Sequence, residues 1–360
     1  MIQSELPESR QLFISVTGAF APKSSARENN KTFERTRREG GGVFAMKNFQ
    51  EFCECVCEHV RGILGEDYTI SMKSVRKNNN ITMEGLLIRY LDSSVAPTIY
   101  LNPYYEQYSE GRTIGHIAEE VAEIYRNNRD PWKEAPSFEF SEIRDKILFR
   151  VINRGLNEEE LMHMPHVEIG DFAVGFQWVV DTDDRRLGSV RVTDEQAESW
   201  GVTTDELTKL AVENSARDVP PVLKSIEEVL HEIVRDNGGS FCGLTESELK
   251  ESSSEQEFPM YVLTNSRSHM GASALLALPF LDEFRDRIGD DFWIFPSSIH
   301  EVILVPVSKV EDRAKLCAMV REINETQVPP QEVLSDEVYS YGEFEDMMPV
   351  GFRAQLQARA

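Results

Sequence analysis

Residues 292–307 read FWIFPSSIHEVILVPV. This stretch contains two short apolar runs, 292–295 and 302–307, whose aromatic and β-branched residues are typical of buried strands. The hexapeptide between them, residues 296–301, contains two serines, a histidine and a glutamate. We expect the two runs to lie side by side in one sheet, with the polar hexapeptide emerging at the edge of that sheet.

The rest of the chain predicts an α+β fold, with mixed or antiparallel sheets and packed amphipathic helices. Apolar residues at helical spacing predict helices at 47–64, 113–127, 141–153, 195–199, 205–214, 222–236 and 311–324. The stretch 271–287 also has a helical pattern, which Pro279 should break or kink. Short apolar or alternating runs predict strands at 68–75, 81–90, 98–101, 171–180, 187–192, 260–264 and 338–341.

At 360 residues the chain is long enough for two or three domains. The order of the predicted elements suggests an N-terminal α-β-β-β-α unit, a middle α+β unit and a C-terminal α+β unit. The boundaries that we predict are a leader at 1–45, units at 46–135, 136–220 and 221–345, and a tail at 346–360.

Residues 1–45 differ from the rest in composition. They contain seven Lys or Arg and five Glu, and no helical or strand period persists, a composition that favours disorder. Residues 37–42, RREGGG, can be encoded almost entirely by purines, as a bacterial ribosome-binding site is. We therefore expect the natural protein to begin at Met46, with the upstream segment a translated leader. The alternative is a genuine flexible arm.

The formal net charge of −24 limits the partners of the chain. A polyanion is repelled by nucleic acid and by anionic membrane surfaces, so we expect neither as a partner. No uncharged apolar run reaches the length of a membrane span. Residues 12–21 resemble a signal peptide, but glutamates precede them where a positive region is needed. The five cysteines are odd in number, and we expect reduced thiols in a cytoplasm.

Two groups of residues have spacings that resemble metal sites. Cys53, Cys55 and Cys57 lie on one predicted helix with His59 nearby, but a helix cannot aim Cys55 at the ion that Cys53 and Cys57 would share. His163 and His166 flank a proline, without a visible complete ligand set. We expect no metal and no cofactor.

Common catalytic motifs are absent from the sequence, including the phosphate-binding loop, the dinucleotide fingerprint, the zinc-protease helix and the nucleophile elbow. The remaining candidates lie in and around the hexapeptide. As a hydrolase, the chain would use His300 as acid or base, Ser298 as nucleophile or substrate contact, and Glu301 or Asp336 to orient the histidine. Asn265, Ser297 and Asp336 are candidate ligand-binding residues. The alternative is that the serines bond local backbone and His300 pairs locally.

Five segments carry a resemblance to a known family: LMHMPHVEIGDFAVGF, WGVTTDELTKLAVENSARDVP, MYVLTNSRSHMGASALL, PSSIHEVILVP and LSDEVYSY. From about Met46 to Phe344 the chain resembles a bacterial family of Firmicutes catalogued as domain of unknown function 5688. Residues 200–307 more weakly resemble a second uncharacterised family, number 1444. The resemblance implies a bacterial, cytoplasmic α+β protein that begins near Met46. It implies no catalytic residues.

Three functions remain open at this point. The first is a binding protein without catalysis, whose protein or small-molecule partner contacts a groove near Asn265, Ser298 and His300. The second is the hydrolase described above. The third is an adaptor whose acidic surface mimics nucleic acid, which predicts carboxylates gathered in a regular stripe.

Overall fold

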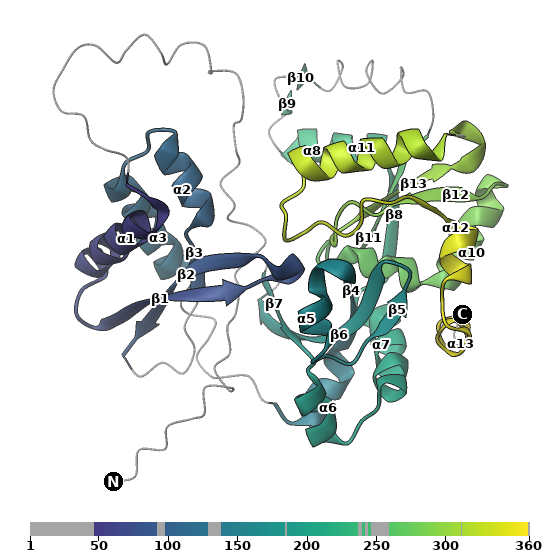
Figure 1. Ribbon diagram of the computed structural model, residues 1–360, viewed down its shortest axis with the longest axis horizontal. Coiled ribbons are helices and arrows are strands. Elements are labelled where there is room, and N and C mark those ends of the chain that lie inside the picture. The colour runs from purple at the N-terminus through teal and green to yellow at the C-terminus, as the bar shows by residue number, and fades with distance from the viewer. Residues whose placement is uncertain are drawn as a thin grey trace. The chain divides into compact units, whose positions relative to one another are not determined.

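A computed structural model describes residues 47–91, 98–128, 138–183, 186–236, 240–241, 244–245, 259–310 and 312–358. The predicted leader and the predicted start at Met46 lie outside these residues. The protein is α+β, as the sequence predicted. It divides into two compact units (Figure 1). The described residues of 1–76, 82–136 and 181–188 form unit 1, and those of 77–81, 137–180 and 189–360 form unit 2.

Unit 1 is built from helices packed on a small antiparallel sheet of strand order β1-β2-β3. Its elements are α1 Phe49–Leu64, β1 Tyr68–Arg76, β2 Thr82–Tyr90, β3 Thr98–Tyr100, α2 Asn102–Ser109 and α3 Ile114–Asn128. Helix α1 begins with a capping box between Asn48 and Glu51. Helix α2 was not predicted. Pro103 lies in its first turn, where proline is tolerated because that N–H needs no helical partner.

Unit 2 contains the remaining elements. They are η3 Asn78–Asn80, α4 Phe140–Ile143, η4 Arg144–Lys146, β4 Ile147–Asn153, η5 Gly155–Asn157, α5 Glu158–Leu161, β5 Val167–Ile169, β6 Phe172–Asp183, β7 Arg186–Arg191, α6 Asp194–Trp200, α7 Thr204–Asp218, β8 Pro221–Ser225, α8 Ile226–Asp236, β9 Ser240–Phe241, β10 Leu244–Thr245, β11 Tyr261–Asn265, η6 Gly271–Leu276, α10 Leu278–Ile288, β12 Phe292–Phe295, β13 Val302–Pro306, η7 Val307–Lys309, α11 Arg313–Thr326, β14 Tyr339–Ser340, α12 Tyr341–Asp346 and α13 Val350–Gln357. The described residues of 181–188, at the end of β6 and the start of β7, belong to unit 1. Among the described residues, no helix has the length and apolar character needed to cross a membrane.

Two antiparallel sheets share the main core of unit 2. One has the strand order β14-β12-β13-β11-β8, and the other consists of β4, β6, β5 and β7. The period of two along a strand sends alternate side chains to opposite faces. Phe292 and Ile294 of β12 therefore join the main core, whereas Phe295 joins a second cluster with Leu316 and Val320 of α11. The stretch 292–307 thus carries core residues on both faces of its sheet.

Two predicted helices are partly strands in the structure. The predicted helix 141–153 is wrong, because only α4 and η4 are helical and residues 147–153 form β4. In ILFRVIN the apolar residues come close together along the chain, and pairing with β6 buries most of this strand. The first residues of the predicted helix 222–236 are also a strand, β8, which pairs with β11. Pro279 separates η6 from α10, as expected.

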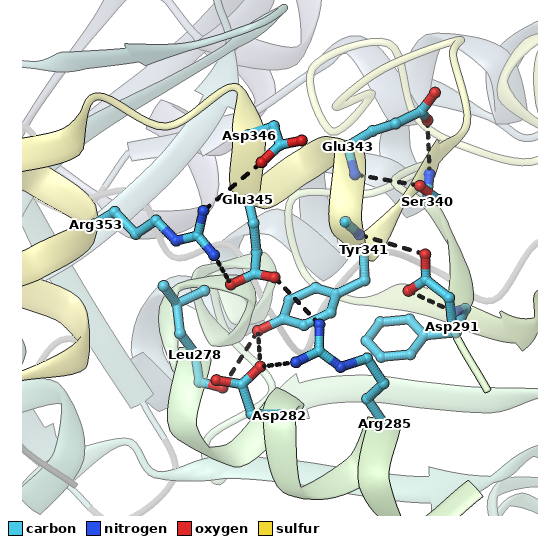
Figure 2. A network of polar contacts seen from close by, with 12 residues as sticks. Leu278, Asp282, Arg285, Asp291, Ser340, Tyr341, Glu343, Glu345, Asp346 and Arg353 are labelled. Atoms are coloured by element: carbon cyan, nitrogen blue, oxygen red, sulfur yellow. Dashed lines mark hydrogen bonds and ion pairs between the residues drawn. The ribbon is translucent and has the colours of Figure 1, made fainter. Parts of the chain in front are cut away.

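The predicted tail contains helix α13, which an ion-pair network joins to α10 and α12 (Figure 2). Only 7% of the Glu345 side chain is exposed, and its carboxylate accepts hydrogen bonds from Arg285 at 3.2 Å and from Arg353 at 2.6 Å. The Tyr341 hydroxyl lies 3.2 Å from Asp282 Oδ1, and the Arg285 guanidinium lies over the Tyr341 ring. Glu345 therefore neutralises two arginines from different helices.

We expect the Glu345→Ala substitution to lower the free energy of unfolding by about 2–3 kcal/mol, because it removes hydrogen bonds to two charged groups. Asp346→Ala is the matched control. Its side chain is 87% exposed and lies 3.8 Å from Arg353, so the cost should stay within about 0.5 kcal/mol. Urea denaturation of both variants measures the difference. Equal costs would show that the buried network adds nothing beyond a surface pair.

Candidate functional site

The polar segment 296–301 connects β12 to β13, which lie side by side as predicted and pair antiparallel. The same segment also runs beside residues 332–335. Ile299 N donates to the carbonyl of Glu332 at 2.9 Å, and Leu334 N donates to the carbonyl of Ser297 at 3.2 Å. Buried Ser298 forms an isolated antiparallel bridge with Val333. These backbone bonds bring Glu332 to the histidine of the segment.

The backbone around His300 holds its ring as a neutral imidazole. Nδ1 accepts a hydrogen bond from the N–H of Met270 at 3.1 Å, so the ring proton lies on Nε2. Nε2 is 3.9 Å from Glu332 Oε1. Burial lowers the pKa of His300. At neutral pH the ring therefore offers an uncharged N–H donor.

The Ser298 hydroxyl takes part in a local backbone hydrogen bond. It accepts a hydrogen bond from the backbone N–H of His300 at 3.0 Å, the local contact expected of a serine two residues earlier. A serine nucleophile needs its hydroxyl to donate to a basic ring nitrogen. In His300 the basic nitrogen, Nδ1, already accepts from Met270. Ser298 and His300 thus meet through the backbone of the turn.

Gly271 allows the backbone at residues 270–271 to pack directly against Thr264 and His300. A Cβ atom at this position would lie 2.0 Å from Thr264 Oγ1 and 2.2 Å from the carbonyl oxygen of His300. The Thr264 hydroxyl itself donates to that carbonyl at 2.8 Å. A side chain at position 271 would therefore displace the backbone that orients the His300 ring, which is why glycine is required here.

His269 lies beside His300, and we call these two residues the histidine pair. The centroids of their rings are 5.5 Å apart. Burial, with smaller contributions from His300 and Arg150, lowers the pKa of His269 to about 4. The predicted ligand residue Asn265 shapes the loop that carries His269, because buried Asn265 donates to the carbonyl of His269 at 2.9 Å and accepts from Arg267 N at 3.0 Å.

A group of cations lies next to the histidine pair. Arg150, in the middle of β4, has 12% of its side chain exposed, and its Nη2 lies 3.9 Å from Glu160 Oε1. The guanidinium of Arg191 contacts the same oxygen atom. Burial lowers the pKa of Arg150 to about 10, and the charge of Arg191 acts in the same direction. Arg150 Nε is buried without a hydrogen-bond partner among the described residues.

The third cation of this group is Lys77, which immediately precedes η3. Burial, followed by the charges of Arg191 and Arg150, lowers the pKa of Lys77 to about 7. Element η3 contacts both β4 and η5, which places Lys77 near Arg150. We call Lys77, Arg150 and Arg191 the basic cluster. Charged groups of one sign that are packed this closely raise the energy of the folded protein unless an anion compensates them.

Asn79 fastens the segment that carries Lys77. Its backbone is left-handed, with φ of 61°, and its side chain is buried. Nδ2 donates to the carbonyls of Pro330 at 2.8 Å and Val333 at 2.6 Å, and Oδ1 accepts from Asn157 Nδ2 at 2.9 Å. Glu332 lies in the sequence between Pro330 and Val333, whose carbonyls accept these bonds. The bonds therefore hold the segment that carries Lys77 beside Glu332 within unit 2.

Two carboxyl groups, those of Glu332 and Glu301, lie beside His300. Burial raises the pKa of Glu332, and the charge of Glu301 adds to this effect. The surrounding protein also raises the pKa of Glu301, although its side chain reaches solvent. This part of unit 2 therefore brings together the basic cluster, the histidine pair and two carboxyls of raised pKa.

A protein-family model, described as a family of unknown function (DUF5688), matches residues 49–343. The chain belongs to the DUF5688 family. No curated protein and no solved structure matches it.

The other predicted ligand residues of this DUF5688 protein lie beside the site. Ser297 contributes its carbonyl to the pairing with Leu334. Exposed Asp336 accepts a hydrogen bond from Asn324 Nδ2 at 2.7 Å. Of the residues named from sequence, the structure brings Asn265, Ser298, His300 and Glu301 near one another.

The residues whose spacing resembles metal sites have other contacts. His166 Nδ1 lies 2.7 Å from the carbonyl of Met164, and His163 is exposed. On α1, Cys53 and Cys57 are buried in the core and Cys55 is partly exposed, as the helical spacing predicted. Within the described ranges, no three potential ligands gather as a metal site requires.

Sequence reasoning missed Lys77, Arg150, Arg191, His269 and Glu332. One signal was present, since Arg150 is a lone charge inside an apolar run that reads ILFRVIN. A charge within a buried strand needs a partner or a function. The predicted helix 141–153 gave Arg150 no special role, because an arginine on a helix normally extends into solvent.

We expect Asn79→Gly to lower the free energy of unfolding by about 2–4 kcal/mol, since it removes three side-chain hydrogen bonds. Glycine accepts the left-handed backbone, so strain is not added. Ser268→Gly is the control, because Ser268 is also left-handed, with φ of 50°, and is exposed. Its cost should stay within about 0.5 kcal/mol. Similar costs in a chemical denaturation series would contradict the role of Asn79.

The histidine pair predicts a pH dependence of stability. In the unfolded chain His269 titrates near its ordinary pKa of 6.5, whereas in the folded protein its pKa is about 4. The unfolded state therefore binds more protons between these values, so stability falls as the pH drops from about 6.5 to about 4. The His269→Gln variant should lose less stability than the wild type over this range. Parallel curves of unfolding free energy against pH would show that His269 does not contribute.

Proposed function

We propose that this protein binds a small anionic ligand in unit 2, at the basic cluster and the histidine pair. One observation carries the proposal. In a chain of net charge −24, the ion pairs of Arg150 and Arg191 lead, in the described part of the chain, to the single carboxylate of Glu160. An anionic ligand would balance the second guanidinium charge, which Glu160 alone does not neutralise.

The histidine pair supports the same proposal. Both imidazoles have lowered pKa values and are uncharged at neutral pH, so they add hydrogen-bond donors without adding further positive charge. Neutral donors beside fixed cations are suited to a ligand that has both a charged group and a polar one. This extends the expectation of a small-molecule partner near Asn265, Ser298 and His300.

Binding is favoured over the hydrolase alternative by the contacts of the hexapeptide. The Ser298 hydroxyl and His300 Nδ1 each accept a backbone N–H, which are contacts that shape a turn. The basic cluster also favours a ligand-binding protein over the acidic mimic, since a positive site is the reverse of what that mimic presents. We place this activity in a bacterial cytoplasm, in line with the resemblance of the sequence.

Thermal unfolding in the presence of anions tests the proposal. Phosphate, sulfate, citrate and acetate would each be compared with chloride at constant ionic strength. We expect at least one of them to raise Tm, by about 2–4 °C for each 1 kcal/mol of binding free energy. The Arg150→Met variant keeps the apolar stem of the side chain and should lose most of this response.

The matched control for Arg150→Met is Arg154→Met, also in unit 2. The Arg154 side chain is 45% exposed and pairs with Glu168 at the surface, so its variant should respond as the wild type does. Two outcomes would overturn the proposal. One is a wild-type protein that no anion stabilises beyond chloride, and the other is equal stabilisation of the wild type and Arg150→Met.

A further inference from the structure

Gln177, in β6, has a buried polar side chain whose oxygen atom has no partner. Only 3% of Gln177 is exposed, and its Oε1 atom accepts no hydrogen bond among the described residues. A buried acceptor of this kind destabilises the folded protein, because it has lost its hydrogen bonds to water and has gained none in return. A ligand that donates a hydrogen bond to Gln177 would remove this penalty.

The pairing of the strands places Gln177 on the same face of its sheet as Arg150. In the ladder between β4 and β6, Gln177 lies opposite Leu148, and Gly175 lies opposite Arg150. Residues that lie opposite each other, or two apart along one strand, point to the same face. Gln177 is thus a diagonal neighbour of Arg150, and such neighbours are typically about 7–8 Å apart.

Arg191 lies on that face as well. The N–H of Val192, just after β7, donates to the carbonyl of Phe176 at 3.0 Å, so these two residues are neighbours across the strands and share a face. Successive side chains along a strand alternate between faces. Arg191 and Gln177 therefore both point to the opposite face from Val192 and Phe176. Both arginines contact Glu160 Oε1, which agrees with this placement.

The same face also carries a donor without a partner. Arg150 Nε is buried and has no hydrogen-bond partner in the described part of the chain. A carboxylate bound here can accept from Arg150, but it has no proton to donate to Gln177. A hydroxyl group next to the carboxylate provides that donor. The two unpartnered atoms are therefore complementary to a ligand that has both groups.

We infer that Gln177 makes the site selective for anions that carry a hydroxyl group next to their charged group, such as α-hydroxy acids. This inference rests on the proposed function and narrows the class of ligand. The carboxylate binds Arg150 and Arg191, and the hydroxyl donates to Gln177 Oε1. An ammonium group in place of the hydroxyl would also donate, but it would bring a further positive charge close to two guanidinium groups. The exposed part of Arg191, 39% of its side chain, connects the site to solvent.

Isothermal titration calorimetry of the full chain with glycolate, propionate, acetate and glycine tests the inference. Glycolate and propionate have the same charge and nearly the same size, and they differ by the exchange of a hydroxyl for a methyl group. At neutral pH and constant ionic strength we expect glycolate to bind at least about tenfold more tightly than propionate, a difference of about 1.4 kcal/mol. Acetate and glycine should also bind more weakly than glycolate.

The Gln177→Met variant separates this role from a structural one. Methionine is close to glutamine in size and has no amide group, so the variant should bind glycolate and propionate with nearly equal affinity. Because the substitution removes a buried acceptor that has no partner, Tm should stay the same or rise. Gln327→Met is the control. Exposed Gln327 donates to its neighbour Thr326, so this variant should keep the wild-type preference for glycolate.

The outcomes distinguish the two proposals. Equal affinity of the wild type for glycolate and propionate, or binding of other anions without glycolate, would overturn the role of Gln177 and leave anion binding intact. A preference for glycolate that Gln177→Met retains would do the same, because another group would then accept from the hydroxyl. A marked fall in Tm in Gln177→Met would also overturn this role, since the amide would already have a partner in the folded protein. If none of these acids and no anion of the thermal unfolding series binds, both proposals fail.

Discussion

The hydrogen bonds of Asn79 are the constraint on which the candidate site depends. A single side chain satisfies two carbonyls of the 330–333 segment and also pairs with Asn157. That segment in turn pairs with residues 296–301 through the backbone. Lys77, Glu332 and His300 come from three distant parts of the sequence, and this chain of hydrogen bonds holds them in one place. Because buried carbonyls are costly to leave without partners, the arrangement has little freedom to relax.

The sequence was most informative where one local pattern decided the structure. The two apolar runs around PSSIHE pair as neighbouring strands, and Pro279 separates two helical segments, because both results follow from local stereochemistry. Residues 147–153 show the opposite case. The same apolar spacing fits a short helix or a buried strand, and only pairing with a distant strand, β6, decides between them.

The site could be predicted only in part for the same reason. His300 and its neighbours Ser298 and Glu301 stand out as adjacent polar residues between strands, and Asn265 lies at the end of another strand. Arg150, Arg191 and Lys77 have no shared motif, because they meet through the pairing of strands and through the Asn79 contacts. Contacts between residues so far apart in sequence leave no periodic signal in one chain.

A positive site within a strongly negative chain affects the rate of ligand capture as well as the affinity. At distances beyond the Debye length an approaching anion meets the repulsive field of the whole molecule, and only near the basic cluster does attraction prevail. Dissolved salt screens the distant repulsion, which speeds encounter, and it also weakens the short-range attraction, which shortens residence. The opposing trends would leave the affinity greatest at an intermediate ionic strength, whereas a site that attracts its ligand over long distances loses association rate steadily as salt is added.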